Sequence, residues 1–187
     1  TLICVLAAAA FFCGGHGQAE EGRVGLALSG DEATEFLRAA EVTSEPETFD
    51  EFAITVPRRL ELTRGSLTLR AVFKNVDTFH WRDFQFGDGR KVSRITDSYR
   101  HEIAAYELDR LLGLGLVAPC VERKISSRTG SLCLWVDASN TMDECEERES
   151  EIPDRQLWDE QVHTVRLFQQ LISDQDFPNV RNIICDR

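Results

Sequence analysis

A switch to a two-residue hydrophobic period after Ala53 constrains the fold more than any other feature of the sequence. The apolar members of this alternation are Leu60, Leu62, Leu67, Leu69, Ala71 and Phe73. Residues 64–66, Arg-Gly-Ser, interrupt it with a turn signal. Alternation of this kind is typical of strands with one buried face, so the sequence predicts an antiparallel hairpin whose second strand ends at Lys74. The apolar residues of that strand share one face, and Lys74 therefore points to the opposite face.

Two later segments carry a helical period instead. The first is predicted to begin at a cap, Asp97 or Ser98, and to end at Gly113. Its expected apolar face consists of Tyr99, Ile103, Tyr106 and Leu111, with Ala104 and Leu108 beside them. The second runs from about Asp154 to Ser173, and its apolar residues are Leu157, Trp158, Val162, Val165, Phe168 and Ile172. With a shorter helix expected after a cap at Ser29 or Asp31, the pattern indicates an α+β fold.

The remaining segments are expected to be loops and one further hairpin. Residues 120–125 and 131–137 alternate on either side of a turn that contains Gly130. Residues 43–51 are a polar linker, and residues 141–154 are a charged, mostly solvated connector. Residues 87–89, Gly-Asp-Gly, predict a turn rather than a phosphate-binding loop, because the G-x-x-x-x-G-K-[ST] pattern and its strand-to-helix context are missing.

Composition places the chain among globular proteins and argues against one class of partner. Of the 187 residues, 42% are hydrophobic and 28% are charged, which is close to the globular average. The net charge is -11, and the 21 Lys and Arg are scattered among 32 acids. Nucleic-acid binding needs clustered basic residues, so we expect no nucleic-acid partner.

The first 19 residues differ from the rest of the chain because they contain no charged side chain. Their apolar run, from Leu2 to Cys13, is about 12 residues long, against about 20 for a bilayer span. With small residues at Gly17 and Ala19, residues 1–19 are predicted to be a signal peptide, and the protein is expected to be exported to the periplasm or secreted. An uncleaved anchor is the alternative, and it would be the only membrane contact. A lipoprotein site at Cys13 is disfavoured by the bulky residues before it.

Export changes how the cysteines are interpreted, since disulfides persist outside the cytoplasm. After signal removal, four remain: Cys120, Cys133, Cys145 and Cys185. Four cysteines allow three pairings, and the sequence does not choose among them. The spacings contain no CxxC and the histidines are dispersed, so a zinc site is not expected.

Three polar features follow one another in an order that suggests phosphoryl transfer. Lys74 ends a strand, Glu102 lies beside the apolar stripe of the next long helix, and an Asp/Asn-rich loop follows the last helix. The candidates in that loop are Asp176 and Asn182. Transfer from ATP needs a cation at the phosphates, an anion that holds this cation, a carboxylate at the attacking hydroxyl and a metal ligand. An ion pair between Lys74 and Glu102 would satisfy both side chains.

Each of these features also has an ordinary structural explanation. Lys74 can be a solvated lysine at a strand end. Glu102 can pair locally with Arg100 or His101. Asp174 and Asp176 can simply end a helix before a turn at Pro178. The order of the three features is more specific than any one of them.

The chain also resembles a known group of proteins. Residues 98–137 are similar to the core of exported bacterial proteins of unassigned function, which carry an E-[IV]-A-A-Y-x-[LV]-D-[RK]-L-L-G-L helix, then V-P-P-x-V-E-R and G-S-L-Q-x-W. The segments RAVFK, 70–74, and LFQQLISDQD, 167–176, fit as well, so the resemblance extends from Glu35 to the end. That group is similar in turn to atypical kinases, including HipA-type Ser/Thr kinases, secretory-pathway FAM-type kinases and phosphatidylinositol kinases.

The resemblance implies a two-lobed, protein-kinase-like fold and a role for each candidate. Lys74 would contact the ATP phosphates and Glu102 would hold Lys74. The strand that includes Trp135 and Val136 would link the lobes and meet the adenine through its backbone. Asp176 would be the catalytic aspartate, and Asn182 would bind the metal, Mg or Mn.

Two departures separate the chain from the family pattern. The family loop reads D-R-N or D-R-H followed by x-G-N, which sets Asp and Asn five residues apart. Here Asp176 and Asn182 are six apart, with Phe177 and Arg181 replacing the Arg and the Gly. Asp174 and Asn179 form an alternative pair at five. The family also continues to an I-D-H-type metal-binding motif, which would lie beyond Arg187.

These observations predict four segments and two candidate functions. The segments are a signal peptide (1–19), an N-terminal helix and linker (20–52), a kinase-like N-lobe (53–137) and the start of a C-lobe (138–187). The expected function is ATP-dependent phosphotransfer outside the cytoplasm to an unknown protein, lipid or small-molecule acceptor, and this stretch alone is expected to be inactive. The alternative is a pseudokinase or a nucleotide- or protein-binding module without catalysis.

Overall fold

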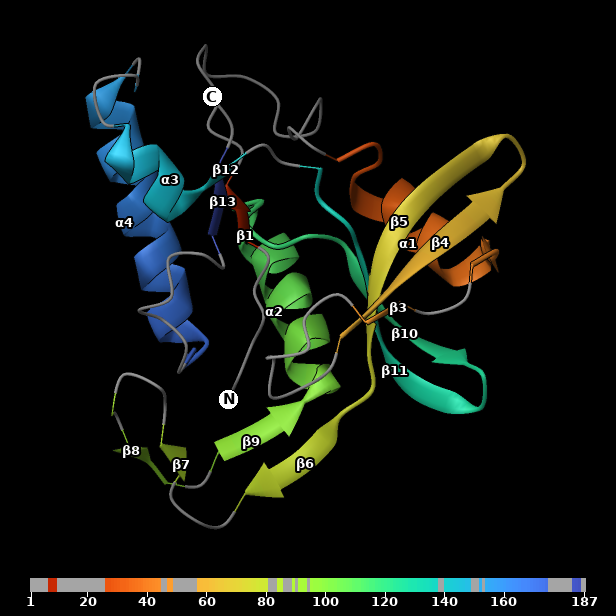
Figure 1. The fold of residues 1–187 in the computed structure, drawn as a ribbon. Helices are drawn as coiled ribbons and strands as arrows, with labels where there is room; N and C mark the ends of the chain where they lie inside the picture. The colour runs from red at the N-terminus through yellow and green to blue at the C-terminus, as the bar shows by residue number, and fades with distance from the viewer. Residues whose placement is uncertain are drawn as a thin grey trace.

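A computed structural model describes residues 7–9, 26–44, 47–48, 57–80, 84–85, 89, 91–93, 95–137, 140–148, 152, 154–174 and 183–185. These residues form a mixed α+β fold in which an antiparallel sheet is flanked by helices (Figure 1). Among them, no helix combines the length and the apolar character needed to cross a bilayer. The α+β class predicted from the sequence is confirmed.

The first hairpin has the predicted strands and turn. Strand β4 (Arg58–Arg64) and strand β5 (Leu67–Lys74) are antiparallel and pair from Arg58 opposite Phe73 to Arg64 opposite Leu67. The chain reverses at residues 65–66, where Gly65 has a φ of 64°, a conformation that glycine adopts without steric cost. Leu60, Leu62, Ala71 and Phe73 are buried. Strand β5 ends at Lys74, as predicted.

The second hairpin forms, but its turn lies earlier than predicted. Strand β10 (Cys120–Ile125) and strand β11 (Arg128–Leu134) are joined by Ser126 and Ser127, which have φ values of 47° and 70°. Gly130, expected in the turn, lies within β11 opposite Arg123. A Cβ atom at Gly130 would be 2.3 Å from the Lys74 carbonyl oxygen, so close strand packing, rather than a turn, explains this glycine.

The main sheet has the strand order β10-β11-β5-β4-β2, with β2 (Glu41–Val42) and β3 (Glu47–Thr48) both pairing with β4. Three smaller sheets complete the strand pairing. Their strands are β1 (Ala7–Ala9), β12 (Asn140–Thr141) and β13 (Ile183–Cys185); β6 (Asp77–His80) and β9 (Ile95–Ser98); and β7 (Phe84–Gln85) and β8 (Lys91–Val92). The turn predicted at 87–89 lies between β7 and β8, but residues 87 and 88 are outside the described part.

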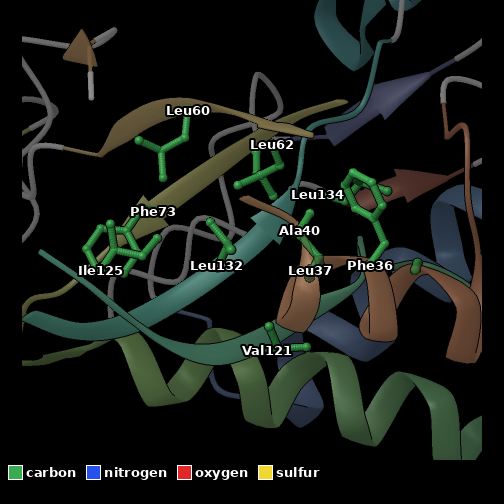
Figure 2. Close-up of a cluster of buried hydrophobic side chains, with 12 residues drawn as sticks. Phe36, Leu37, Ala40, Leu60, Leu62, Phe73, Val121, Ile125, Leu132 and Leu134 are labelled. Carbon is green, nitrogen blue, oxygen red and sulfur yellow. The ribbon is translucent and has the colours of Figure 1, made fainter. Parts of the chain in front are cut away.

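Helix α1 (Gly30–Ala39) packs on one face of the main sheet. Ser29 is its N-cap residue. Figure 2 shows the core of this face, which contains Phe36, Leu37, Ala40, Leu60, Leu62, Phe73, Val121, Ile125, Leu132 and Leu134. The Arg123 guanidinium donates to the carbonyl oxygens of Leu37 and Ala40, at 2.7 and 2.6 Å. This contact ties the end of α1 to strand β10.

Helix α2 (Tyr99–Leu112) covers the opposite face through contacts with β10 and β11. Beyond it lie α3 (Met142–Glu147) and α4 (Arg155–Leu171). The core on this side consists of Ala105, Tyr106, Leu116, Val117, Cys120, Met142, Trp158, Val162, Val165, Phe168 and Ile183. The strand alternation explains the two cores, because neighbouring residues such as Cys120 and Val121 face opposite sides of the sheet.

Two sequence predictions about this side are corrected. Leu111, assigned to the apolar face of α2, is 82% exposed, whereas Glu102 and Asp109 are buried on that helix. Residues 141–154, expected to be a charged, mostly solvated connector without a helix, contain α3 with a capping box at Thr141 and a single buried residue of that helix, Met142. In both places a hydrophobic pattern fails to mark the buried positions. On α2 these positions carry the polar side chains of Glu102 and Asp109, and in α3 the buried Met142 stands among polar neighbours.

The structure selects one cysteine pairing. Cys120 and Cys133 are opposite one another in the second hairpin and form a disulfide. The side chain of Cys185 is outside the described part. Strand β1 lies within the predicted signal peptide and pairs in parallel with β13, so this pairing belongs to the chain that retains residues 1–19.

Candidate functional site

The candidate site begins at the last residue of strand β5. Phe73 points into the core under α1, so Lys74 points to the α2 side of the sheet. Its strand partner is Ser131 of β11, and its side chain is only 3% exposed. The explanation of Lys74 as a solvated strand-end lysine is therefore wrong.

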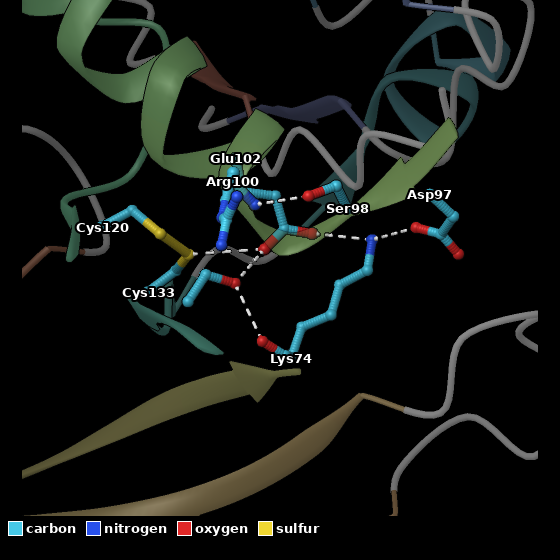
Figure 3. Close-up of polar contacts among 8 residues, drawn as sticks. Lys74, Asp97, Ser98, Arg100, Glu102, Cys120 and Cys133 are labelled. Carbon is cyan, nitrogen blue, oxygen red and sulfur yellow. Dashed lines mark hydrogen bonds and ion pairs between the residues drawn. A yellow bond between two sulfur atoms is a disulfide. The ribbon is translucent and has the colours of Figure 1, made fainter. Parts of the chain in front are cut away.

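Glu102 lies in the first turn of α2 and pairs with Lys74. Ser98 caps this helix by accepting a hydrogen bond from the Arg100 backbone N–H, and this cap positions Glu102 over strand β5. Lys74 Nζ is 3.0 Å from Glu102 Oε1, and the Ser131 hydroxyl donates to Glu102 Oε2 at 2.6 Å (Figure 3). Both carboxylate oxygens thus have a partner. The predicted Lys74–Glu102 ion pair is confirmed, and local pairing of Glu102 with Arg100 or His101 is not observed.

A second carboxylate, missed by the sequence analysis, reaches the same lysine. Asp97 is the third residue of β9, and its Oδ1 is 3.2 Å from Lys74 Nζ. Lys74 thus lies between two buried carboxylates, one from a strand and one from the following helix (Figure 3). In the sequence Asp97 was a possible helix cap. No sequence pattern connected Asp97 with Lys74, because strand β6 and the segment between β6 and β9 separate the two residues in the chain.

The two carboxylates control the electrostatics of Lys74. Burial of the ammonium by itself would lower its pKa, but the charges of Glu102 and Asp97 and their hydrogen bonds raise the pKa above the ordinary 10.5. Lys74 is therefore a fixed positive charge at neutral pH. A fixed cation on a strand facing a helix can neutralise part of an anionic ligand such as a phosphate.

The disulfide lies directly beside this cluster. Cys133 Sγ is 3.8 Å from Glu102 Oε2 (Figure 3). Cys120, Cys133 and Glu102 are close enough together to form a three-ligand metal group. Metal-binding cysteines must be thiolates, and these two sulfurs are bonded to one another, so the oxidised protein cannot use them in that way.

Trp135 and Val136, the predicted linker to the adenine, follow the end of β11. Val136 is buried, and the half-buried Trp135 ring has the guanidinium groups of Arg59 and Arg70 at 6.0 and 5.5 Å. The Trp135 backbone N–H donates to the Arg70 carbonyl oxygen at 2.9 Å, which extends the sheet by one bond. Trp135 is four residues from the Lys74 partner Ser131, or about 13 Å along a strand.

The candidate residues of the C-terminal loop are only partly described. Asp174, the alternative to Asp176, lies three residues beyond the end of α4 and is buried. Its Oδ2 accepts a hydrogen bond from Gln169 Nε2 at 3.2 Å, which holds the end of the helix. Asp176, Asn179 and Asn182 lie outside the described residues. Among the residues that the structure describes, Lys74, Glu102 and Asp97 are brought together.

Comparisons with known proteins add no further identification. Neither family models, nor curated proteins, nor solved structures give a match to this chain. The geometry of the Lys74 cluster is consequently the firmest guide to function.

Proposed function

We propose that this protein is an exported, kinase-like phosphotransferase that uses ATP with Mg or Mn. The observation that carries the proposal is the buried ion pair between Lys74 Nζ and Glu102 Oε1, at 3.0 Å. A nucleotide triphosphate needs a positive charge whose position is fixed before the ligand arrives. A strand-end lysine held by a helix carboxylate supplies such a charge.

The surroundings of the ion pair favour a functional role. A structural pair in this position could be replaced by apolar side chains at little cost, since burying charges is expensive. Here three ionised groups and the Ser131 hydroxyl converge under α2. Trp135 lies about 13 Å along the direction of β11 from Ser131, the strand partner of Lys74.

The other roles in the proposal come from the family resemblance. Residues 135–136 would meet the adenine, Asp176 would orient or deprotonate the acceptor hydroxyl, and Asn182 would bind the metal. The metal, when bound, would neutralise charge on the phosphate oxygens. The acceptor is a protein, lipid or small molecule. Export to the periplasm or secretion rests on the predicted signal peptide.

A non-catalytic nucleotide-binding module is the second candidate. One observation favours it: Asp174, which has the family spacing to Asn179, is buried and bonded to Gln169. The remaining register, Asp176 with Asn182, has an extra residue. A protein of this kind would keep the Lys74 charge for binding and would not transfer phosphate.

Thermal denaturation with saturating ATP and Mg²⁺ tests nucleotide binding in the full-length protein. Ligand that binds only the folded state raises the melting temperature. The expected result is a rise in the unmodified protein, no rise in Lys74→Ala, and an unchanged rise in Lys124→Ala, which removes an exposed strand lysine. If Lys74→Ala does not fold, the double variant Lys74→Met with Glu102→Gln is used in its place, because it leaves no unpaired charge at Glu102. Absence of a shift in the unmodified protein would contradict the proposal.

Transfer of labelled phosphate from ATP separates the two candidates. A phosphotransferase is expected to label itself or an added acceptor, and Asp176→Ala should abolish labelling while leaving the ATP-induced thermal shift intact. A thermal shift without labelling in the unmodified protein would favour the binding module.

A further inference from the structure

The charges around Lys74 do not balance. Lys74 contributes one positive charge, whereas Asp97 and Glu102 contribute two negative charges, and all three side chains are less than a tenth exposed. Within the described part of the chain, Lys74 is the only cation that pairs with either carboxylate. The cluster therefore carries a net negative charge in a buried position, where an uncompensated charge is costly.

The excess charge can be assigned to one atom. Glu102 uses Oε1 for Lys74 and Oε2 for Ser131. Asp97 directs Oδ1 at Lys74, while its Oδ2 is buried without a hydrogen-bond partner among the described residues. Figure 3 shows this oxygen pointing away from both Lys74 and Glu102. Asp97 Oδ2 is thus a buried anionic acceptor that lacks a donor or a cation.

The chemistry of this atom suits a hard divalent cation. Mg²⁺ and Mn²⁺ prefer carboxylate oxygens, and Mg²⁺ in nucleotide sites is bound by one or two carboxylates together with phosphate oxygens and water. Asp97 Oδ2, which has no hydrogen-bond partner among the described residues, meets that requirement. The other oxygen of the same carboxylate, Oδ1, is 3.2 Å from Nζ of Lys74, the residue proposed to contact the phosphates. Glu102 is a poorer ligand, because both of its oxygens are already engaged.

We propose that Asp97 Oδ2 binds the divalent cation that accompanies the nucleotide. In this arrangement Asp97 uses one oxygen to hold Lys74 and the other to hold the metal, so that the ammonium and the metal ion flank the same phosphates. The inference rests on the proposed function for the identity of the nucleotide. Metal binding by Asp97 can be measured without it.

Binding of Mn²⁺, followed by the electron paramagnetic resonance signal of the free ion, tests the proposal in the full-length protein. The variant is Asp97→Asn, which keeps the side-chain volume and removes the charge. The control is Asp77→Asn, because Asp77 is an exposed carboxylate on the strand that pairs with β9. Each protein is titrated with Mn²⁺ alone and with Mn²⁺ at saturating ATP.

The expected result is Mn²⁺ binding by the unmodified protein and by Asp77→Asn, and at least about tenfold weaker binding by Asp97→Asn. ATP affinity without metal should be unchanged or higher in Asp97→Asn, because the substitution removes a negative charge near the phosphates. Equal Mn²⁺ affinity in all three proteins, or no Mn²⁺ binding by the unmodified protein at millimolar concentration, would overturn the inference.

The test separates this inference from the proposed function. Mn²⁺ binding that depends on Asp97 in a protein that does not bind ATP would support the metal site and contradict the nucleotide site. ATP binding whose metal dependence survives Asp97→Asn would do the reverse. If Asp97→Asn does not fold, ¹⁵N-labelled unmodified protein gives the answer, since Mn²⁺ at Asp97 must broaden the amide signals of Thr96 and Ser98 before those of the distant α1. Uniform or absent broadening contradicts the proposal.

Discussion

At the scale of single residues, two buried acids of helix α2 serve different partners. Glu102 meets a charge from strand β5, whereas Asp109 near the other end of the helix meets backbone amides. Asp109 is fully buried, and its two carboxylate oxygens accept from the Leu116 and Val117 N–H groups, at 2.9 and 3.1 Å. The loop after α2 is shaped by these bonds, and that loop delivers the chain into β10.

Replacing Asp109 with Asn should therefore destabilise the protein without touching the Lys74 cluster. Asn offers one acceptor oxygen for two amides and turns an N–H₂ group toward the other, so the expected loss is about 2 to 3 kcal/mol. Urea denaturation measures it. Asp159→Asn is the control, since its pair with Arg155 is about half exposed and should contribute under about 1 kcal/mol. Similar losses in both variants would contradict this explanation of Asp109.

His101 makes the stability depend on pH. Burial and the nearby Lys74 charge lower the His101 pKa below its ordinary 6.5. As the pH falls, His101 of the unfolded chain therefore takes up a proton before His101 of the folded chain does. The contribution of neutral His101 to the free energy of unfolding is complete above pH 6.5 and is lost as the pH falls through the folded-state pKa. The urea midpoint of the unmodified protein should fall more between pH 8 and pH 5 than that of His101→Gln. Parallel curves would contradict the assignment.

The residues of the site were predictable from sequence to different degrees. Lys74 and Glu102 could be found because each ends or flanks a clear periodic pattern. Asp97 could not, because its importance depends on strand β9 meeting the Lys74 side chain, which is a tertiary contact. Leu111 was placed inside and is exposed for a related reason. The buried face of α2 includes two acids whose partners are remote in sequence, and hydrophobic periodicity counts them as surface.

At the scale of elements, the close contact between β5 and β11 fixes the position of Lys74. Gly130 should not tolerate a side chain, because a Cβ atom there would lie 2.3 Å from the Lys74 carbonyl oxygen and 2.9 Å from the Phe73 ring. Gly130→Ala is expected to destabilise the protein by about 1 to 3 kcal/mol through overpacking and to weaken the proposed nucleotide binding. Urea denaturation and the ATP-induced thermal shift measure the two effects.

Gly65→Ala provides the matched comparison. Gly65 has a φ of 64° but no atom within 4 Å of an added Cβ, so its replacement should cost about 1 kcal/mol from backbone conformation alone. The proposed nucleotide binding should be unchanged in this variant. If Gly130→Ala behaved like Gly65→Ala in both measurements, close packing at Lys74 would not be the reason for this glycine.

Element prediction succeeded where one physical signal dominated. Both hairpins and the helices α2 and α4 follow from period and caps. The turn of the second hairpin was misplaced because Gly130 resembles a turn residue, whereas Ser126 and Ser127 adopt the positive φ values. Helix α3 was missed because it is six residues long and buries a single large side chain, Met142. So short an element has too few positions for a period to be recognised.

At the scale of the whole molecule, the hairpin of β10 and β11 separates two apolar cores and is closed by the Cys120–Cys133 disulfide. Proteolysis without reductant should yield a peptide linked through these two residues. A 13-residue separation implies a stabilisation of up to about 3 kcal/mol, so Cys120→Ala with Cys133→Ala should lower the melting temperature. A pairing of Cys120 or Cys133 with any other cysteine would contradict the structure.

The sequence did not choose among the three possible cysteine pairings, because such a pairing is decided by contacts of the whole fold. Pairing depends on which strands are neighbours, and Cys120 meets Cys133 because the hairpin turn places them opposite one another. Neighbouring strands such as β5 and β11 are 54 or more residues apart in the chain, as the Lys74 and Ser131 pair shows with a separation of 57. A single sequence contains no direct record of such contacts.

Because side chains of strand β5 alternate between its two faces, the position of Lys74 is sensitive to a one-residue change in the length of the strand. Phe73 occupies the core under α1 and Lys74 the ionic cluster under α2, so the loss or gain of one residue within the strand would exchange an aromatic ring for an ammonium on both faces. Substitutions in β5 can be gradual in their effects, but length changes cannot. Natural relatives that keep the Lys74 cluster are therefore expected to vary in length at residues 65–66, where the chain is exposed, and not between that turn and the lysine.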